Sequence, residues 1–377
     1  MRGTKGSSKF NDFLVVLKIA VVLIFIYVGF KYINTDNLTP FVPQNTGVFG
    51  EYGWSGVLRG AAIVFFAFLG FDAISTAAQE TQNPRRNMPI GILGSLLICT
   101  LLYMVFALVM TGVVDYHAYK GADSIAPAAT AIAHMGPTAA DGTVTPAYPW
   151  LNRGIILAIL MGYASVVLVT LLGQSRVFYS MSRDGLLPPI FSHLHKRYHT
   201  PARSNALFMV VIGLLAGVVP ASVAGEMTSI GTLFAFALVC LGVIVVRRTQ
   251  PNVPRGFKTP FVPWVPAAGV VCCVSMMLFL PADTWIRLVM WMLIGLDVYS
   301  TYGVRHSVSG NGTMRRTGQS VLNGIGVIVA VLCVMTGFWH QQTVGWNESH
   351  LMLWIAVLFG IGHIFYYLVR GFWHQAR

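Results

Sequence analysis

The chain has 377 residues, of which 55% are hydrophobic and only 10% are charged. An ordinary soluble domain carries about 25% charged residues, so this composition excludes a soluble globular protein. The formal net charge of +12 invites a nucleic-acid-binding interpretation, but the basic residues lie in short strips between long apolar runs. That distribution follows the positive-inside rule for membrane proteins, and we expect no nucleic-acid partner.

Ten apolar runs are long enough to cross a lipid bilayer, which takes about 20 residues as a helix. They predict an all-α polytopic membrane protein with lipid as its solvent. Basic residues concentrate in alternate loops and at both ends, which places both termini in the cytoplasm. The expected spans are 12–30, 57–80, 89–113, 152–180, 204–220, 226–246, 263–281, 284–304, 320–339 and 351–369.

The first predicted span, 12–30, contains a lysine, Lys18, about two turns from its start. An ammonium group within a span must find polar partners or lose its proton, so Lys18 is a candidate functional residue. The competing interpretation is that the side chain reaches the cytoplasmic face. That face lies only about 9 Å away at helical rise.

The second predicted span, 57–80, carries Gly70, Phe71 and Asp72 at its midpoint. A charge at the bilayer centre costs about 2.5–3.5 kcal/mol, so Asp72 indicates a functional or structural requirement. Gly70 has the backbone freedom to interrupt a helix, and an interrupted helix exposes backbone groups that a ligand can use. This combination is typical of a transporter binding site.

Two further expectations concern the outer and inner sides of the membrane. An alanine-rich stretch from Ile125 to Met135 is too short to cross the bilayer and predicts an external amphipathic or lid helix. The span 152–180 is expected to continue as a helix beyond the membrane until Gly185 and Pro188 stop it.

The span 284–304 contains two charged residues, Arg287 and Asp297. Ten residues of helix separate them by about 15 Å, so they cannot pair with each other. We expect Asp297 to serve packing or an oligomer contact.

No motif for catalysis or for a bound metal is present in the sequence. Nucleotide-binding and nucleophile motifs are missing, which argues against an enzyme and for transport driven by an ion gradient. His193 and His195 have no cysteine or carboxylate at ligand spacing, so a metal site there is not expected. Five cysteines lie inside predicted spans and are interpreted as small apolar fillers: Cys99, Cys240, Cys272, Cys273 and Cys333.

Three strings carry a resemblance to a known family: FNDFLVVLKIAVVLIFIYVGF (10–30), FFAFLGFDAISTAAQE followed by NPRRNMPIGI (65–92), and GQSRVFYSMSRDGLLP (173–188). With them, the chain resembles the amino acid–polyamine–organocation (APC) permeases, and specifically the bacterial relatives of the cationic amino acid transporters. The resemblance covers essentially the whole chain. It implies the LeuT-like fold of inverted helical repeats.

Members of that family have twelve or fourteen spans, and the resemblance aligns this chain from their fifth span onward. The chain would then be N-terminally truncated and hold the C-terminal ten of about fourteen transmembrane helices. Residues 1–304 would form a partial permease core, family spans 5–12. Residues 305–377 would form an appended C-terminal transmembrane hairpin, family spans 13–14.

The resemblance assigns substrate binding to Phe66, Ala67, Leu69, Gly70 and Asp72. In the family this helix is unwound at its middle, and its free carbonyls bind the α-amino group of the substrate. Phe66 would close over the substrate from outside, although plain packing competes with that role. Asp72 would favour a cationic amino acid or anchor the broken helix, and the residues alone do not decide between these roles.

The same resemblance puts Lys18 where sodium-coupled members of the superfold bind a cation, with Ser165 as its hydroxyl partner. Protonation and deprotonation of Lys18 would couple transport to protons, with no other cofactor. The implied function is a secondary, alternating-access amino acid transporter of the bacterial inner membrane. The alternative is a non-transporting fragment that needs the missing first four helices.

Overall fold

The structure is a computed structural model that describes residues 4–71, 81–119, 127–137, 144–195, 200–255, 257–308, 316–346 and 349–375. Within these ranges the regular elements are helices, as the sequence predicts. Asp72 lies outside the described residues, as does most of the predicted second half of its span.

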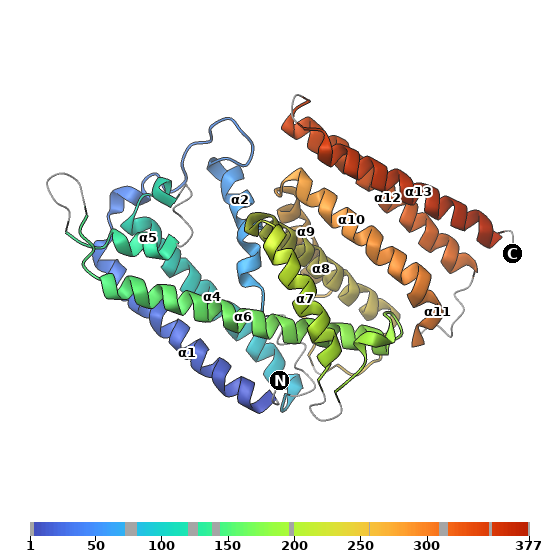
Figure 1. The fold of residues 1–377 in the computed structure, drawn as a ribbon, viewed down its shortest axis with the longest axis horizontal. Coiled ribbons are helices and arrows are strands. Elements are labelled where there is room, and N and C mark those ends of the chain that lie inside the picture. The colour runs from blue at the N-terminus through green and yellow to red at the C-terminus, as the bar shows by residue number, and fades with distance from the viewer. Residues whose placement is uncertain are drawn as a thin grey trace. The chain divides into compact units, whose positions relative to one another are not determined.

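Each of the ten predicted spans contains a helix (Figure 1). Shorter elements lie between them, including α5 (Pro127–Ala133), α11 (Val304–His306) and a π-helical turn at Tyr299–Gly303. The ten helices are α1 (Thr4–Gly29), α2 (Gly53–Val64), α4 (Pro84–Val113), α6 (Pro149–Arg183), α7 (Ala202–Val218), α8 (Ala221–Thr249), α9 (Trp264–Leu278), α10 (Ala282–Val298), α12 (Arg316–Val344) and α13 (Leu351–Gln375).

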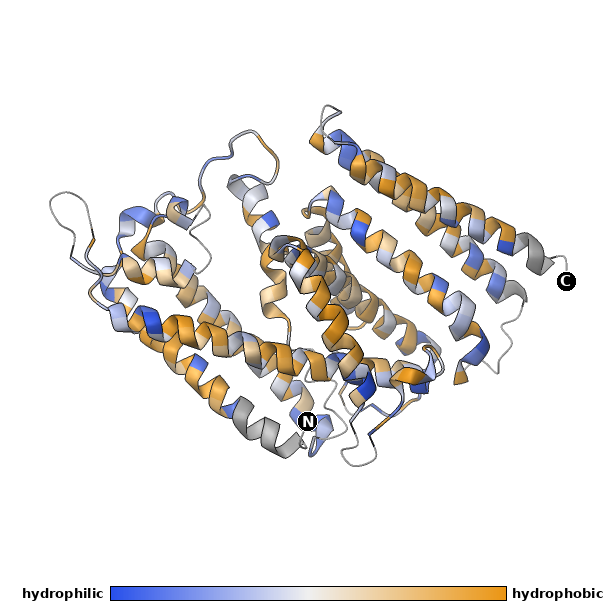
Figure 2. Ribbon diagram, in the orientation of Figure 1, coloured by the Kyte–Doolittle hydropathy of each residue, from blue (hydrophilic) through white to orange (hydrophobic). Residues whose placement is uncertain are grey.

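Among the described residues, six helices are long and apolar enough to cross a membrane. They are α1, α4, α6, α8, α12 and α13, and apolar residues run along them in Figure 2. Helices α7 and α9 are apolar but shorter, as is the stretch Gly53–Phe68. The chain is therefore a multi-pass membrane protein, whereas the full number of ten spans and the inverted repeat stay predictions.

The chain forms two compact units, and the first is built from α1, α4, α5 and the first part of α6. Its buried cluster joins Phe25 of α1, Val109 of α4, Ile132 of α5 and Ile155 of α6. A short helix, α5, is thus present in the expected stretch, whereas its external position stays a prediction. However, Ile132 is fully buried, so α5 is a packed part of this core and not a detached lid.

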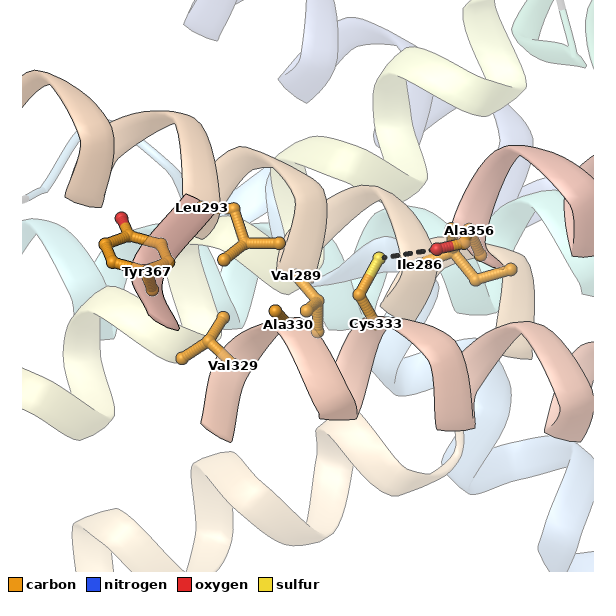
Figure 3. Packing of buried hydrophobic residues seen from close by; sticks show 8 residues of the cluster. All are labelled: Ile286, Val289, Leu293, Val329, Ala330, Cys333, Ala356 and Tyr367. Carbon is orange, nitrogen blue, oxygen red and sulfur yellow. Dashed lines mark hydrogen bonds between the residues drawn. The ribbon is translucent and has the colours of Figure 1, made fainter. Parts of the chain in front are cut away.

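The second unit contains α2, the end of α6 and the helices from α7 to α13. Helices α10, α12 and α13 share one apolar cluster, which Figure 3 shows from close by. Leu293 comes from α10, Cys333 from α12 and Ala356 from α13, and the Cys333 thiol donates a hydrogen bond to the Ala356 carbonyl. The predicted C-terminal hairpin therefore packs on α10. Its status as a separate domain from residue 305 stays a prediction.

A second cluster in this unit fixes α2. Ala62 of α2 packs with Ile230 and Leu233 of α8, Met277 of α9 and Leu288 of α10. All five side chains are buried. This cluster positions the end of α2 and hence the start of the expected binding site.

Helix α6 ends at Arg183, three residues past the predicted span 152–180 and just before Gly185, as the sequence predicts. Gly185 has a positive φ of 79°, and a Cβ there would lie 1.9 Å from the His306 carbonyl oxygen. Only glycine fits such a position, because other residues bring both a side-chain clash and backbone strain.

Candidate functional site

The predicted helix break is present in the backbone. Helix α2 ends at Val64, and the tighter 3-10 turn Phe65–Phe68 follows it. Leu69 then turns to an extended ψ of 137°, and Gly70 adopts a positive φ of 124°. Residues with a Cβ rarely adopt that φ, so Gly70 is the residue type the break needs.

The backbone at the break makes a hydrogen bond that the resemblance does not imply. The Leu69 N–H donates a hydrogen bond of 3.0 Å to the Phe66 carbonyl, so this carbonyl is not a free acceptor. The 3-10 turn makes the bond because it tightens the last turn of a helix and satisfies exposed backbone groups. A carbonyl keeps a second lone pair, which a substrate amine can still use.

Helix α8 holds the end of α2 from the side. The Ser229 hydroxyl, fully buried, donates a 2.8 Å hydrogen bond to the Ile63 carbonyl. The Phe66 ring lies beside Gly225, where an added Cβ would sit 3.6 Å from Cε1 of the ring. Because 44% of Phe66 is exposed, the ring is not a core residue, which leaves it available to contact a substrate.

Glu226, the residue after Gly225 on α8, forms charged contacts that the sequence did not indicate. The Glu226 carboxylate accepts hydrogen bonds from Thr284 at 3.1 Å and from Arg287 at 3.3 Å, and Arg287 also pairs with Asp283. The four-residue spacing of Asp283 and Arg287 on one helix could have revealed their pairing. Glu226 could not be found, because it comes from α8 while the others come from α10.

Lys18 and Ser165, the two residues assigned to coupling, meet in the first unit. The Lys18 ammonium donates a 3.3 Å hydrogen bond to the Ser165 hydroxyl, across 147 positions of sequence. Lys18 is half-buried and Ser165 is only 5% exposed. The side chain is therefore directed at α6 in this structure, whereas the coupling role itself stays a prediction.

A cavity of about 200 Å³ adjoins the Lys18 side chain. Its lining is mainly apolar and includes Phe25, Phe106, Ile155 and Gly162. Gly162 permits close approach, since an added Cβ would lie 3.3 Å from Cδ of Lys18. The cavity surrounds the lysine stem with carbon atoms, so the hydroxyl of Ser165 is a significant polar partner for the ammonium.

The described site residues form two groups, the coupling pair and the residues along the break. Lys18 and Ser165 belong to the first unit. Phe66, Ala67 and Leu69 belong to the second unit, and Gly70 is the residue at which the chain returns to the first. Among the described residues, which include His193 and His195, no group of three side chains could hold a metal ion. What the arrangement offers chemically is a membrane-embedded ammonium and an interrupted helix.

Long apolar helices with these two features define a multi-pass membrane protein of the transporter class. The chain matches the amino acid permease family over residues 1–296, and it belongs to that family. Permeases are transport proteins and not enzymes, as the sequence indicated.

The chain is similar to transporters from both bacteria and plants. Over 305 residues the chain is 39% identical to the branched-chain amino acid permease BcaP of Bacillus subtilis, covering 81% of this chain and 61% of the relative. It is 38% identical over 307 residues to the methylthioribose transporter of Bacillus subtilis, with 81% and 62% covered. With cationic amino acid transporter 1 of Arabidopsis thaliana it shares 25% identity over 362 residues, with 80% and 57% covered. The chain thus spans about three fifths of the length of these relatives.

Proposed function

We propose that the chain acts in secondary active transport of an amino acid by alternating access, with protons as the coupling ion. The contact between Lys18 and Ser165 is the observation that carries the coupling step. A neutral hydroxyl cannot compensate an ammonium charge, so the charge on Lys18 is sensitive to any rearrangement that admits or excludes water. Proton release from Lys18 would accompany the change between outward-facing and inward-facing states.

The proposed substrate is an amino acid with an apolar side chain. Two relatives support a small-molecule substrate: the branched-chain amino acid permease BcaP and the methylthioribose transporter. Carbonyls at Ala67, Leu69 and Gly70 would receive the α-amino group, and the exposed ring of Phe66 would contact the apolar side chain.

A cationic amino acid is the second candidate, because a carboxylate follows the break at Asp72. The similarity to a plant cationic amino acid transporter also favours it. The proposed location is the inner membrane of a bacterium with both termini in the cytoplasm, on the strength of the basic loops.

Uptake by proteoliposomes tests the proposal. Purified chain is reconstituted and offered radiolabelled leucine, lysine or methylthioribose, with and without an inward proton gradient. Lys18→Met should lower gradient-stimulated uptake by at least about tenfold, since it removes the titratable charge. Lys31→Met is the matched control, because Lys31 is exposed near the other end of the same span and lies 5.4 Å from the Tyr27 ring centroid.

The outcomes distinguish the two candidate substrates and test the coupling role of Lys18. Uptake of leucine but not lysine supports the apolar substrate, whereas uptake of lysine that Asp72→Asn abolishes supports the cationic one. Full gradient stimulation in Lys18→Met contradicts coupling through Lys18. If inserted, folded protein takes up none of the three, the alternative of a non-transporting fragment is supported. Co-expression with the portion of BcaP outside the aligned region then tests whether further helices restore uptake.

A further inference from the structure

A histidine on α13 faces hydrogen-bond acceptors with both of its ring nitrogens. The Nδ1 atom of His363 lies 2.8 Å from the Phe359 carbonyl oxygen, one turn earlier on the same helix. The Nε2 atom lies 2.9 Å from Oδ2 of Asp297, which α10 contributes. Neither contact involves Lys18 or the broken helix.

The two contacts together determine how many protons the pair holds. The carbonyl and the carboxylate oxygen are both acceptors, whereas a neutral imidazole has one N–H and can donate to only one of them. In neutral histidine the other ring nitrogen would then direct its lone pair at an acceptor, at 2.8 Å for Nδ1 or 2.9 Å for Nε2, and two acceptors at such a distance repel each other. Both contacts are satisfied together only when the pair holds one more proton than neutral imidazole and ionised carboxylate, either as imidazolium facing carboxylate or as imidazole facing a carboxylic acid.

Neighbouring groups complete the site around Asp297. Its other carboxylate oxygen, Oδ1, accepts a 2.7 Å hydrogen bond from the hydroxyl of Tyr367, which is 1% exposed. Arg370 lies farther along α13 and donates to the hydroxyl and the carbonyl of Ser300, and to the Tyr366 hydroxyl at 3.1 Å.

The third helix, α12, contributes one titratable group to the cluster, Cys333, whose thiol donates to the Ala356 carbonyl about two turns of α13 before His363. Val329 and Ala330 of α12 are in the shared apolar cluster, and Gly326 approaches the Tyr367 ring. In the described part of the chain, the titratable and charged groups that the three helices contribute around this site are thus Asp297, Cys333, Tyr366, Tyr367 and Arg370.

We propose that His363 and Asp297 form a proton-binding site within the membrane region, and that the bound proton joins α13 to α10. His363 lies near the middle of the candidate span Leu351–Gly371, where a hydrogen bond is poorly replaced by water. Loss of the proton would leave the lone pair of one ring nitrogen against an acceptor, either the Asp297 carboxylate or the Phe359 carbonyl, and weaken the contacts of His363. The site is independent of the transport proposal, because its contacts involve neither Lys18 nor the broken helix.

The first experiment determines the protonation state directly. Purified full-length protein with ¹⁵N-labelled histidine is studied by NMR at pH 8, and the His363 signals are assigned by their loss in His363→Gln. Infrared spectra of the wild type and of Asp297→Asn report a protonated carboxyl group at Asp297. An imidazolium spectrum for His363, or a carboxylic acid band that Asp297→Asn removes, supports the site. A neutral imidazole together with an ionised Asp297 overturns it.

Two other histidines provide matched controls for the NMR spectra. His134 and His306 make the same contact from Nδ1 to the carbonyl one turn earlier, at 2.9 and 3.0 Å. Both are exposed, and in the described ranges neither has a carboxylate at Nε2. The His363 spectrum should differ from theirs at the same pH, because His363 faces a carboxylate with Nε2 and they do not.

A second experiment uses the pH dependence of thermal stability. Asp297→Asn preserves the shape and the Tyr367 contact, and its amide can donate to a neutral Nε2 without any bound proton. We expect the melting temperature of the wild type to fall more steeply than that of Asp297→Asn as pH rises from neutral to alkaline. Parallel profiles would overturn the proposed proton link between α10 and α13, whatever the transport activity of the chain.

Discussion

Ser229 contributes one hydroxyl group at the point where α2 gives way to the broken segment. Its hydrogen bond to the Ile63 carbonyl comes from a different helix, so it fixes where the turn Phe65–Phe68 begins in relation to α8. A buried hydroxyl without a partner would be costly, which makes this bond specific as well as stabilising.

Ser229→Ala should therefore loosen the end of α2. Leaving the buried carbonyl without this donor is expected to cost about 1–2 kcal/mol of unfolding free energy. Amide exchange of residues 64–69 should rise, because the turn loses its tie to α8. Chemical unfolding in mild detergent and hydrogen-exchange mass spectrometry measure the two effects.

Thr228→Ala is the matched control for Ser229→Ala. Thr228 is the adjacent residue, but its hydroxyl bonds to the Ala224 carbonyl within α8 itself. Its loss should change the unfolding free energy by less than about 0.5 kcal/mol. Equal exchange at 64–69 in the two variants would show that the Ser229 contact does not hold the end of α2.

At the scale of elements, the packing of α12 against α13 depends on small residues. A Cβ on Gly360 would meet Cγ2 of Val334 at 2.6 Å and the Ala330 carbonyl oxygen at 2.8 Å. Gly337 likewise approaches the Ala356 methyl group, at 2.8 Å from an added Cβ. Small residues at such contacts let two helices in a membrane approach closely, where van der Waals packing drives association.

Gly360→Ala should separate these helices and destabilise the C-terminal hairpin. Overpacking at a rigid backbone carbonyl is expected to cost about 1–3 kcal/mol. Gly362→Ala is the control, because an added Cβ there meets no atom within 4 Å. In that open position the change should be neutral or stabilise the helix by up to about 1 kcal/mol. Indistinguishable melting temperatures for the two variants would contradict the close approach at Gly360.

The helices themselves were largely predictable because their signals are local. Apolar length placed a helix in every expected span, and Gly185 marked the end of α6 correctly. The break at Gly70 followed from a glycine and a charge in one apolar run. The burial of α5 did not follow, since a short alanine-rich segment gives no sign of which neighbours will cover it.

At the scale of the whole molecule, the site depends on contacts that sequence spacing cannot show. Lys18 and Ser165 were paired only through a family resemblance, and 147 positions separate them. Asp297 was assigned to packing or an oligomer contact, whereas the structure gives it partners within the chain, His363 and Tyr367. A charged residue in an apolar span indicates that a partner is needed, but not which helix supplies it.

The two compact units predict a division of stability across the chain. Each has its own buried cluster, one centred on α1, α4 and α5 and the other including α10, α12 and α13. Regions with separate cores commonly open as separate cooperative units. Gly360→Ala should therefore raise amide exchange in α10, α12 and α13 while leaving α1 and α4 unchanged.

A substitution in the first unit should give the reverse pattern. A Cβ on Gly29 would lie 2.4 Å from Cγ1 of Val109 and 2.9 Å from Cε of Met135, inside the first cluster. Gly29→Ala is therefore expected to raise exchange in α1 and α4 and to spare α12 and α13, as hydrogen-exchange mass spectrometry can measure. If either variant raised exchange throughout the chain, the two clusters would form a single cooperative unit. Helix α6 would then be the element that joins their stabilities, because it passes from one unit into the other after Gly173.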